Sequence, residues 1–318
     1  MTIDIARLLE PKEYSYHKEE NSQSYHFIVV GAGGTGGYLI PNLARMVSIK
    51  NKEGEVSHNI TIVDADLIED KNLLRQQFVT PDIGKNKAEV MAQRYGRSFG
   101  LTIGYMKKYI EDPEDLVKLM KSSSSTPVII DAVDNNKTRL VMKEALDTYG
   151  ADAESLIVSS GNEEYAGQVI FTYKNKFRVN AATALSGMSA NTPSLFEIFP
   201  TAEIGLLPTE LSCAEQAISA PQNIHTNMTA ANIIFGYANK LLNFEPIDQL
   251  AIFFDTKTQA NSIYPATQSG MRDLLTMTEK NITMFDYFED VPFEESEAVY
   301  PPSLKDLSIR ETERVEVL

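Results

Sequence analysis

A glycine-rich segment of the chain has the composition and spacing of a phosphate-binding turn. Its four glycines are Gly31, Gly33, Gly34 and Gly36, in the pattern G-x-G-x-x-G. An apolar run at residues 27–30 and apolar residues at helical spacing at 38–47 predict a strand before the glycines and a helix after them. Glycine lets such a turn approach a ligand closely, and the first N–H groups of the helix can bind phosphate. The pattern alone does not distinguish a dinucleotide from ATP, or either of them from a turn without a ligand.

Asp64 could bind the ribose of a nucleotide. It follows a second apolar run, residues 60–63, and a carboxylate at the end of a strand can accept hydrogen bonds from ribose hydroxyls. Asp64 lies further from the glycines than the usual ~20 residues, and a polar loop expected at residues 50–59 accounts for the difference. A strand-end aspartate is also typical of a turn or a helix cap, so both interpretations stay open.

A third group of residues combines cations, amides and carboxylates. Its members are Asp66, Asn72, Arg75, Gln76, Lys85 and Lys87, followed after the next expected strand by Asp134 and Asn135. An enzyme that transfers part of a triphosphate needs cations to offset the phosphate charge, whereas a nicotinamide enzyme does not. Taken one by one, the basic residues are typical of a solvated surface, so only their combination favours a triphosphate.

The combination resembles the ThiF/MoeB/HesA family, the bacterial relatives of the ubiquitin-activating enzymes. The pattern of that family is a glycine turn, then D-x-D-x-V-x-x-S-N-L-x-R-Q, then G-x-x-K, then D-x-x-D-N. The residues that match it are, in order, the glycine turn, Asp64, Asp66, Asn72, Arg75, Gln76, Gly84, Lys87, Asp131, Asp134 and Asn135. The resemblance covers roughly residues 27–255.

The resemblance implies that the chain binds ATP and Mg²⁺. Asp64 would hold the ribose, and the glycine turn would approach the phosphates. Asn72, Arg75 and Lys87 would contact the triphosphate, and Asp66, Gln76, Lys85 and Asn135 complete the expected nucleotide-binding set. Asp134 would bind Mg²⁺, a hard cation that prefers oxygen ligands.

The activity implied by the resemblance is adenylation of the C-terminal glycine of a small ubiquitin-like or sulfur-carrier protein. Its carboxylate would attack the α-phosphorus of ATP, with Arg75, Lys87 and Asp134 as catalytic residues. No general base is needed, because a carboxylate is already ionised at pH 7. The alternatives are activation of another acceptor, either a peptide C-terminus or a modified tRNA base, and a non-catalytic subunit that binds a ubiquitin-like protein. A dehydrogenase is the last alternative.

The chain has one cysteine, Cys213, which excludes an internal disulfide and a multi-cysteine zinc site. No zinc is therefore expected, although many relatives carry two Cys-x-x-Cys pairs. By resemblance, Cys213 lies where the family can place a catalytic cysteine that accepts the acyl group. A free cysteine is also commonly a small buried hydrophobe, so both interpretations stay open. The N-terminal R-Y-x-R-Q element of the family is not recognisable, since Arg7 is the only arginine of the lead segment.

Strands that alternate with helices predict an α/β fold. We expect a Rossmann-like, doubly wound and mostly parallel sheet, with an antiparallel extension in the second half around residues 167–173. The expected domains are an N-terminal arm at 1–26, a ThiF-like ATP-binding adenylation domain at 27–260 and a C-terminal extension of unknown role at 261–318. The nucleotide-binding half would span about 27–150, and a long loop is expected at 177–210.

The composition limits the classes of partner that the protein is expected to bind. The chain of 318 residues has 29 Lys and Arg against 44 Asp and Glu, a formal net charge of −15, which disfavours nucleic acid and anionic membranes. No export signal or membrane-spanning run is recognisable, which predicts a cytoplasmic protein. The resemblance adds the expectation of a homodimer.

Overall fold

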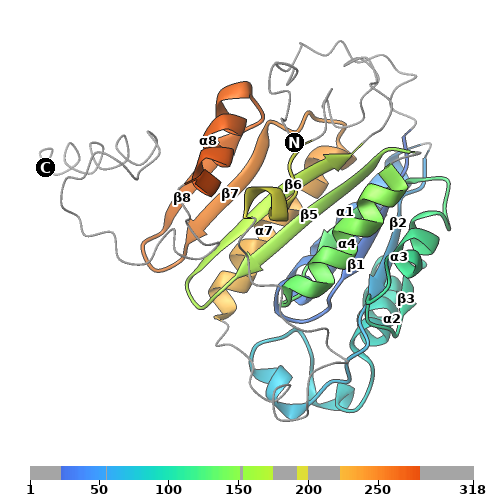
Figure 1. Ribbon diagram of the computed structural model, residues 1–318. Helices are drawn as coiled ribbons and strands as arrows, with labels where there is room; N and C mark the ends of the chain where they lie inside the picture. The colour runs from blue at the N-terminus through green and yellow to red at the C-terminus, as the bar shows by residue number, and fades with distance from the viewer. Residues whose placement is uncertain (1–22, 55, 151–152, 175–191, 200–222, 280–318) are drawn as a thin grey trace, which may run out of the picture.

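Eight strands form one twisted sheet. The computed structural model describes residues 23–54, 56–150, 153–174, 192–199 and 223–279 (Figure 1). The strands are β1 (Tyr25–Val30), β2 (Asn59–Val63), β3 (Gly104–Met106), β4 (Thr126–Asp131), β5 (Ser155–Asn162), β6 (Ala166–Lys174), β7 (Gln249–Asp255) and β8 (Ala260–Pro265). They lie in the order β3-β2-β1-β4-β5-β6-β7-β8. Strands β1 to β5 are mutually parallel, and β6, β7 and β8 are added antiparallel. The predicted fold class is confirmed.

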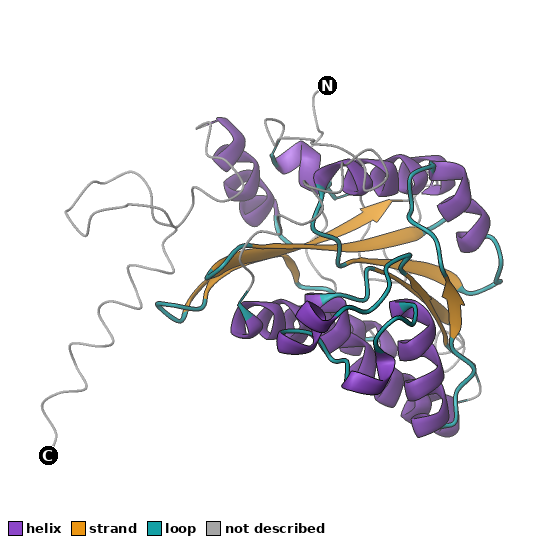
Figure 2. Ribbon diagram, turned by 90° about the horizontal axis from the view of Figure 1, so that it is seen from below, coloured by secondary structure: helices purple, strands orange, loops and turns teal. Residues whose placement is uncertain are grey.

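Helices cover both faces of the sheet, as Figure 2 shows with the sheet seen edge-on. The α-helices are α1 (Gly34–Glu53), α2 (Lys87–Phe99), α3 (Pro113–Met120), α4 (Asn136–Gly150), α5 (Leu195–Ile198), α7 (Ile224–Leu242) and α8 (Gln268–Glu279), with short 3₁₀ turns η3 (Asp70–Leu74) and η4 (Thr80–Asp82). Neighbouring side chains of β1 point to opposite faces, as the two-residue period of a strand requires. Phe27 and Val29 pack with α1, α2 and α7, whereas Ile28 and Val30 pack with α3 and α4.

Local sequence signals explain several helix ends. The side chain of Asn86 accepts a hydrogen bond from the N–H of Glu89 at 3.0 Å and begins α2, and Gly100, with φ +68°, ends it. Asp112 caps α3 by accepting from the N–H of Glu114 at 2.8 Å. These are the capping residues that sequence rules favour. None of the described helices is long and apolar enough to span a membrane.

The strand order reverses direction at the carboxyl end of β1. From β1 the chain runs outward to β2 and β3, and then crosses to β4 on the other side of β1. The connections after β1 and β4 therefore leave in opposite directions, which opens a ligand-binding crevice in folds of this type. The glycine turn, Asp64 and the segment that carries Asp134 all follow strands at this edge.

The structure differs from the sequence-based prediction in five elements. Helix α1 continues to Glu53, where the polar loop was expected from residue 50. Strands β3 and β8 and helix α8 were not predicted. Within the expected loop at 177–210, the described residues include the short helix α5. Arg7 and Cys213 lie outside the described residues.

Candidate functional site

The glycine turn is tight on one side and open on the other. Gly31 has φ +98°, and its N–H donates to the carbonyl of Val63 at 2.9 Å. A Cβ on Gly36 would lie 2.0 Å from the carbonyl oxygen of Gly31, so only glycine fits there. At Gly33 the nearest atom to such a Cβ is Nε2 of Gln76 at 3.6 Å, which is ordinary contact.

The N-terminus of α1 is free to receive an anion from the open side of the turn. In the described part of the chain no side-chain capping hydrogen bond forms at its N-cap residue, Gly33, and the first turn contains no acidic residue. The first N–H groups of a helix lack partners within the helix, and the helix dipole favours negative charge beside them. The turn can therefore bind a phosphate group through its backbone.

Asp64 joins the turn to the neighbouring strand. One carboxylate oxygen accepts from the N–H of Ala32 at 2.7 Å, and the other accepts from the N–H of Asp66 at 2.8 Å. Burial raises the pKa of Asp64 to about 6, although the charge of Lys87 and the two backbone donors oppose the rise. The lone pairs that remain on the two oxygens can accept hydrogen bonds from a ligand.

Lys87 is held at the start of α2 by Asp66. Its Nζ lies 2.7 Å from Oδ2 of Asp66, and the lysine side chain is only 7% exposed. The hydroxyl of Tyr109 donates to the other oxygen of Asp66. Burial would raise the pKa of Asp66, but the charge of Lys87 and its hydrogen bond outweigh burial and lower it. The amide of Asn86 donates to the carbonyls of Asp64 at 2.9 Å and Asp66 at 3.1 Å and fixes this loop to α2.

The other predicted residues of this block occupy different environments. Asn72 is buried, and its side-chain oxygen accepts from the N–H of Glu69 at 2.8 Å, which shapes η3. Gln76 reaches the glycine turn, and its Oε1 is buried without a hydrogen-bond partner among the described residues. Arg75 is half-buried beside η3, and Lys85 is exposed.

The loop between β4 and α4 lies against the glycine turn. A Cβ on Gly31 would be 2.5 Å from the carbonyl oxygen of Ala132. Asp134 is exposed, and Asn135 accepts from the N–H of Thr138 at 2.8 Å, so it caps α4. The structure therefore brings Asp134 and the glycine turn to the same edge of the sheet.

Arg139 is a residue that the sequence analysis missed. It lies on the buried face of α4 and donates to Oδ2 of the fully buried Asp131 at 3.3 Å. It also donates to the carbonyl of Ser160 at 2.7 Å, to the side-chain oxygen of Asn136 at 2.8 Å and to the carbonyl of Val133. It thereby ties the loop that carries Asp134 to β4 and β5. An arginine on the apolar stripe of an amphipathic helix was the available signal.

Asn227 was missed as well. It is 1% exposed in the first turn of α7, and its side-chain oxygen accepts from the amide of Asn162 at 2.9 Å. The hydroxyl of Thr35, in the first turn of α1, lies 3.3 Å from the side-chain oxygens of both asparagines. Asn227 continues the buried stripe of Ala230 and Ile234 at helical spacing, and an asparagine on such a stripe was a visible signal.

The residues present suit ATP with Mg²⁺. The glycine turn, the buried Lys87 and the carboxylate of Asp64 lie near one edge of the sheet. The exposed carboxylate of Asp134 suits Mg²⁺, which keeps several waters and arrives with phosphates. In the part of the chain that the structure describes, no group of three or more His, Cys, Asp or Glu side chains forms a metal site. The expectation about zinc therefore stays a prediction.

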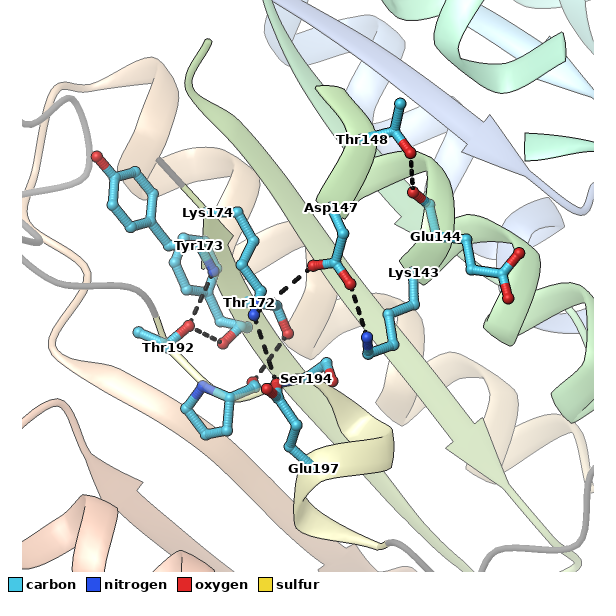
Figure 3. A network of polar contacts seen from close by, with 12 residues as sticks. Lys143, Glu144, Asp147, Thr148, Thr172, Tyr173, Lys174, Thr192, Ser194 and Glu197 are labelled. Carbon is cyan, nitrogen blue, oxygen red and sulfur yellow. Dashed lines mark hydrogen bonds and ion pairs between the residues drawn. The ribbon is translucent and has the colours of Figure 1, made fainter. Parts of the chain in front are cut away.

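The segment that contains α5 is fixed to the sheet by the polar network of Figure 3. Thr192 accepts from the N–H of Tyr173 at 2.8 Å. Lys174 lies 3.8 Å from Asp147 of α4 and 3.5 Å from Glu197 of α5. This network anchors the chain between two ranges outside the described residues, 175–191 and 200–222, the second of which contains Cys213.

A family model for the ThiF family matches residues 5–243, well over half of the chain. The chain belongs to the ThiF family. Membership supports ATP binding and ATP-dependent adenylation as its class of activity. A comparison with curated proteins finds no match.

Solved structures confirm the shared fold. PaaA is 14% identical, with a TM-score of 0.52, and the match covers 78% of this chain and 74% of PaaA. E. coli MccB is 16% identical, with a TM-score of 0.51, and the match covers 78% of this chain and 63% of MccB, less than two thirds of its length. E. coli TcdA, a tRNA N6-threonylcarbamoyladenosine dehydratase, is 28% identical over 37% of this chain and 44% of its own, with a TM-score of 0.31. The likeness to TcdA is confined to part of the chain.

Proposed function

We propose that this ThiF-family protein is an adenylyltransferase that activates the C-terminal carboxylate of a small ubiquitin-like or sulfur-carrier protein. The observation that carries the proposal is the convergence of three features at one edge of the sheet. These are Asp64 at the end of β2, the open glycine turn at the end of β1 and the Asp134 loop after β4. A nucleotide laid across these strand ends would meet a ribose acceptor, a phosphate cradle and a metal-binding carboxylate in that order.

The proposed roles follow from the chemistry of each residue. Asp64 accepts hydrogen bonds from the ribose, and the N–H groups at the start of α1 contact the phosphates. Lys87 and Arg75 offset the charge that develops around the α-phosphate. Asp66, Asn72, Gln76, Lys85 and Asn135 complete the nucleotide-binding set. Mg²⁺ would be held by Asp134 with phosphate oxygens and would neutralise part of the triphosphate charge.

Because Lys87 is paired with Asp66 at 2.7 Å, a phosphate must compete with this carboxylate for the lysine. The pair keeps the buried ammonium ion compensated before ATP arrives, since an isolated buried charge is costly. A bound phosphate oxygen would then share Lys87 with Asp66, and the lysine has three N–H donors for this purpose.

The proposed reaction is a nucleophilic substitution at phosphorus. An oxygen of the acceptor carboxylate forms a bond to the α-phosphorus, and the bond from that phosphorus to the oxygen bridging to the β-phosphate breaks. Pyrophosphate leaves with the electron pair, and the acceptor becomes an acyl-adenylate. We extend the proposal to transfer of the acyl group to the Cys213 thiolate, which would release AMP, and to a homodimer as the working assembly.

Isotopic exchange between pyrophosphate and ATP tests the proposal. Exchange should depend on a protein or peptide that ends in Gly-Gly with a free carboxylate. Asp134→Ala should abolish exchange, whereas Asp273→Ala, which removes an exposed carboxylate of α8, should leave it unchanged. Cys213→Ala should spare exchange and stop only thioester formation. Absence of exchange with carrier proteins, peptides and small acids would refute adenylation and favour a non-catalytic binding role.

A further inference from the structure

Three polar side chains meet inside the protein at the carboxyl end of β5. Thr35 is 6% exposed and Asn227 is 1% exposed, and Asn162 is half-buried at the last position of the strand. The amide of Asn162 donates to the side-chain oxygen of Asn227 at 2.9 Å. They come from the first turns of α1 and α7 and from β5, so three separate elements converge on this point.

The amide nitrogen of Asn227 has no partner within this cluster. Its Nδ2 is buried and lacks a hydrogen-bond acceptor among the described residues. It is directed at the first turn of α1, because a Cβ on Gly34 would lie 2.3 Å from it. A buried donor without an acceptor is unfavourable, and a ligand oxygen between Asn227 and the α1 N-terminus would satisfy it. The uncapped N-terminus beside it favours the same kind of ligand, an anionic oxygen.

The strand order indicates which substrate this position serves. Asp64 follows β2, the glycine turn follows β1, the Asp134 loop follows β4 and Asn162 ends β5. The strands β2, β1, β4 and β5 are neighbours in that order. With the ribose at β2 and the phosphates at β1 and β4, the next position along the edge is on the far side of the α-phosphate from the nucleoside. In-line attack on the α-phosphorus comes from the side opposite the leaving pyrophosphate. With the triphosphate drawn toward Arg75 and Lys87, which lie between β2 and β3 in the chain, that side faces β5.

We propose that Asn227 and Asn162 bind the acceptor carboxylate and, after the reaction, the acyl oxygen of the adenylate. Nδ2 of Asn227 donates to the carboxylate oxygen that does not attack, and Asn162 orients the amide of Asn227 by donating to its side-chain oxygen. The N–H groups at the start of α1 supply the second set of donors. This inference rests on the proposed adenylation function and assigns its acceptor site.

A matched pair of nucleosides measures the contribution of the acyl group to binding. One is 5′-O-(N-glycylsulfamoyl)adenosine, a stable analogue of a glycyl-adenylate, and the other is 5′-O-sulfamoyladenosine, which lacks the glycyl group. Isothermal titration calorimetry with wild type should give tighter binding of the glycyl compound. Asn227→Asp and Asn162→Asp should each reduce that advantage by about tenfold, the value of one hydrogen bond to a ligand, and leave 5′-O-sulfamoyladenosine binding unchanged.

The aspartate substitution separates a ligand donor from a structural cap. A residue that only accepted a hydrogen bond from the start of α1 would keep that role as aspartate, because a carboxylate is an excellent helix cap. A residue that donates to an anionic oxygen loses its donor and repels the ligand. Thr226→Val is the matched control, since Thr226 is also in the first turn of α7. Among the described residues its hydroxyl donates to the carbonyl of Glu164 at 2.7 Å and lies 3.0 Å from the hydroxyl of Thr256.

The outcomes are distinct. The acceptor site would be refuted if both aspartate variants still bound the glycyl compound as much more tightly as wild type does. Equal binding of the two nucleosides by wild type would refute it as well. Either result would leave the proposed nucleotide site unaffected. Failure of wild type to bind either nucleoside, or ATP, would instead refute the proposed function itself. Circular dichroism of each variant controls for folding, and the half-buried Asn162 provides a test that stands if Asn227→Asp does not fold.

Discussion

Replacement of Arg139 by methionine should strongly destabilise the protein. The arginine side chain is 7% exposed and its partner Asp131 is 0% exposed, with Nε 3.3 Å from the carboxylate. Methionine fills much of the same volume but cannot compensate the buried charge of Asp131. The carbonyl of Ser160, 2.7 Å from the guanidinium, also loses its donor.

The expected cost follows from this burial. Removing one partner of a buried ion pair typically costs about 3–5 kcal/mol, because an uncompensated charge remains. The exposed pair Lys118–Glu114 on α3, with side chains 72% and 78% exposed, is the matched control. Lys118→Met should cost no more than about 0.5 kcal/mol. The double variant Asp131→Asn/Arg139→Met should recover part of the loss, because no charge is then left buried.

The cost should also depend on pH. Burial raises the pKa of Asp131, and the charge of Arg139 opposes this rise. Without Arg139 the pKa rises further. A group with a raised pKa stabilises the folded state fully below its unfolded pKa, and that stability is lost as the pH rises through its folded pKa. Arg139→Met should therefore be less destabilised at pH 5 than at pH 8.

Urea unfolding followed by circular dichroism at the two pH values measures both effects. A loss of free energy of unfolding below about 1 kcal/mol, or one that is equal at pH 5 and pH 8, would refute this view of the pair. ATP affinity should fall as well, because the loop that carries Asp134 loses its link to β5.

Three further substitutions test the glycine turn, helix α7 and the buried His58. Gly36→Ala puts a Cβ 2.0 Å from the carbonyl oxygen of Gly31, so pyrophosphate exchange should fall by about 10²-fold. Gly236→Ala, whose Cβ meets nothing within 4 Å, should instead raise the free energy of unfolding by about 0.5–1 kcal/mol. Burial lowers the pKa of His58 from 6.5 to about 4, so the stability that neutral His58 contributes is present above pH 6.5 and is lost as the pH falls toward 4. His58→Asn keeps an acceptor for the N–H of Tyr25. Between pH 7 and pH 4.5, the free energy of unfolding of this variant, measured with urea, should fall by about 2–3 kcal/mol less than that of wild type. An equal fall in both proteins would contradict this role of His58.

Much of the fold could be predicted from local sequence, and so could the strand ends at which the candidate nucleotide-binding residues lie. The parallel strands are short apolar runs because they are buried on both faces, and the glycines and Asp64 follow those runs directly. Strand β8 was not predicted because its burial does not follow the hydrophobicity of its residues. Ser262 and Tyr264 are buried in it while Ile263 is 49% exposed, so hydrophobic periodicity pointed to no strand.

The rest of the site depends on contacts between distant parts of the chain. Arg139 reaches a carbonyl on a neighbouring strand, and Asn227 meets Thr35 across most of the sequence. His58 stands in a polar stretch, yet α1 extends far enough for the Asn51 side chain to bond both backbone groups of His58 and bury it. Such partners follow from the topology and not from residue spacing.

The fate of the acceptor oxygen tests the central proposal most directly. An acceptor that supports pyrophosphate exchange is labelled with ¹⁸O in its C-terminal carboxylate and turned over with ATP, and the products are examined by ³¹P NMR and mass spectrometry. Attack on the α-phosphorus predicts pyrophosphate and AMP, with one ¹⁸O atom in the AMP phosphate once the acyl group has left. ADP with inorganic phosphate, or AMP without the label, would contradict adenylation of a carboxylate at this site.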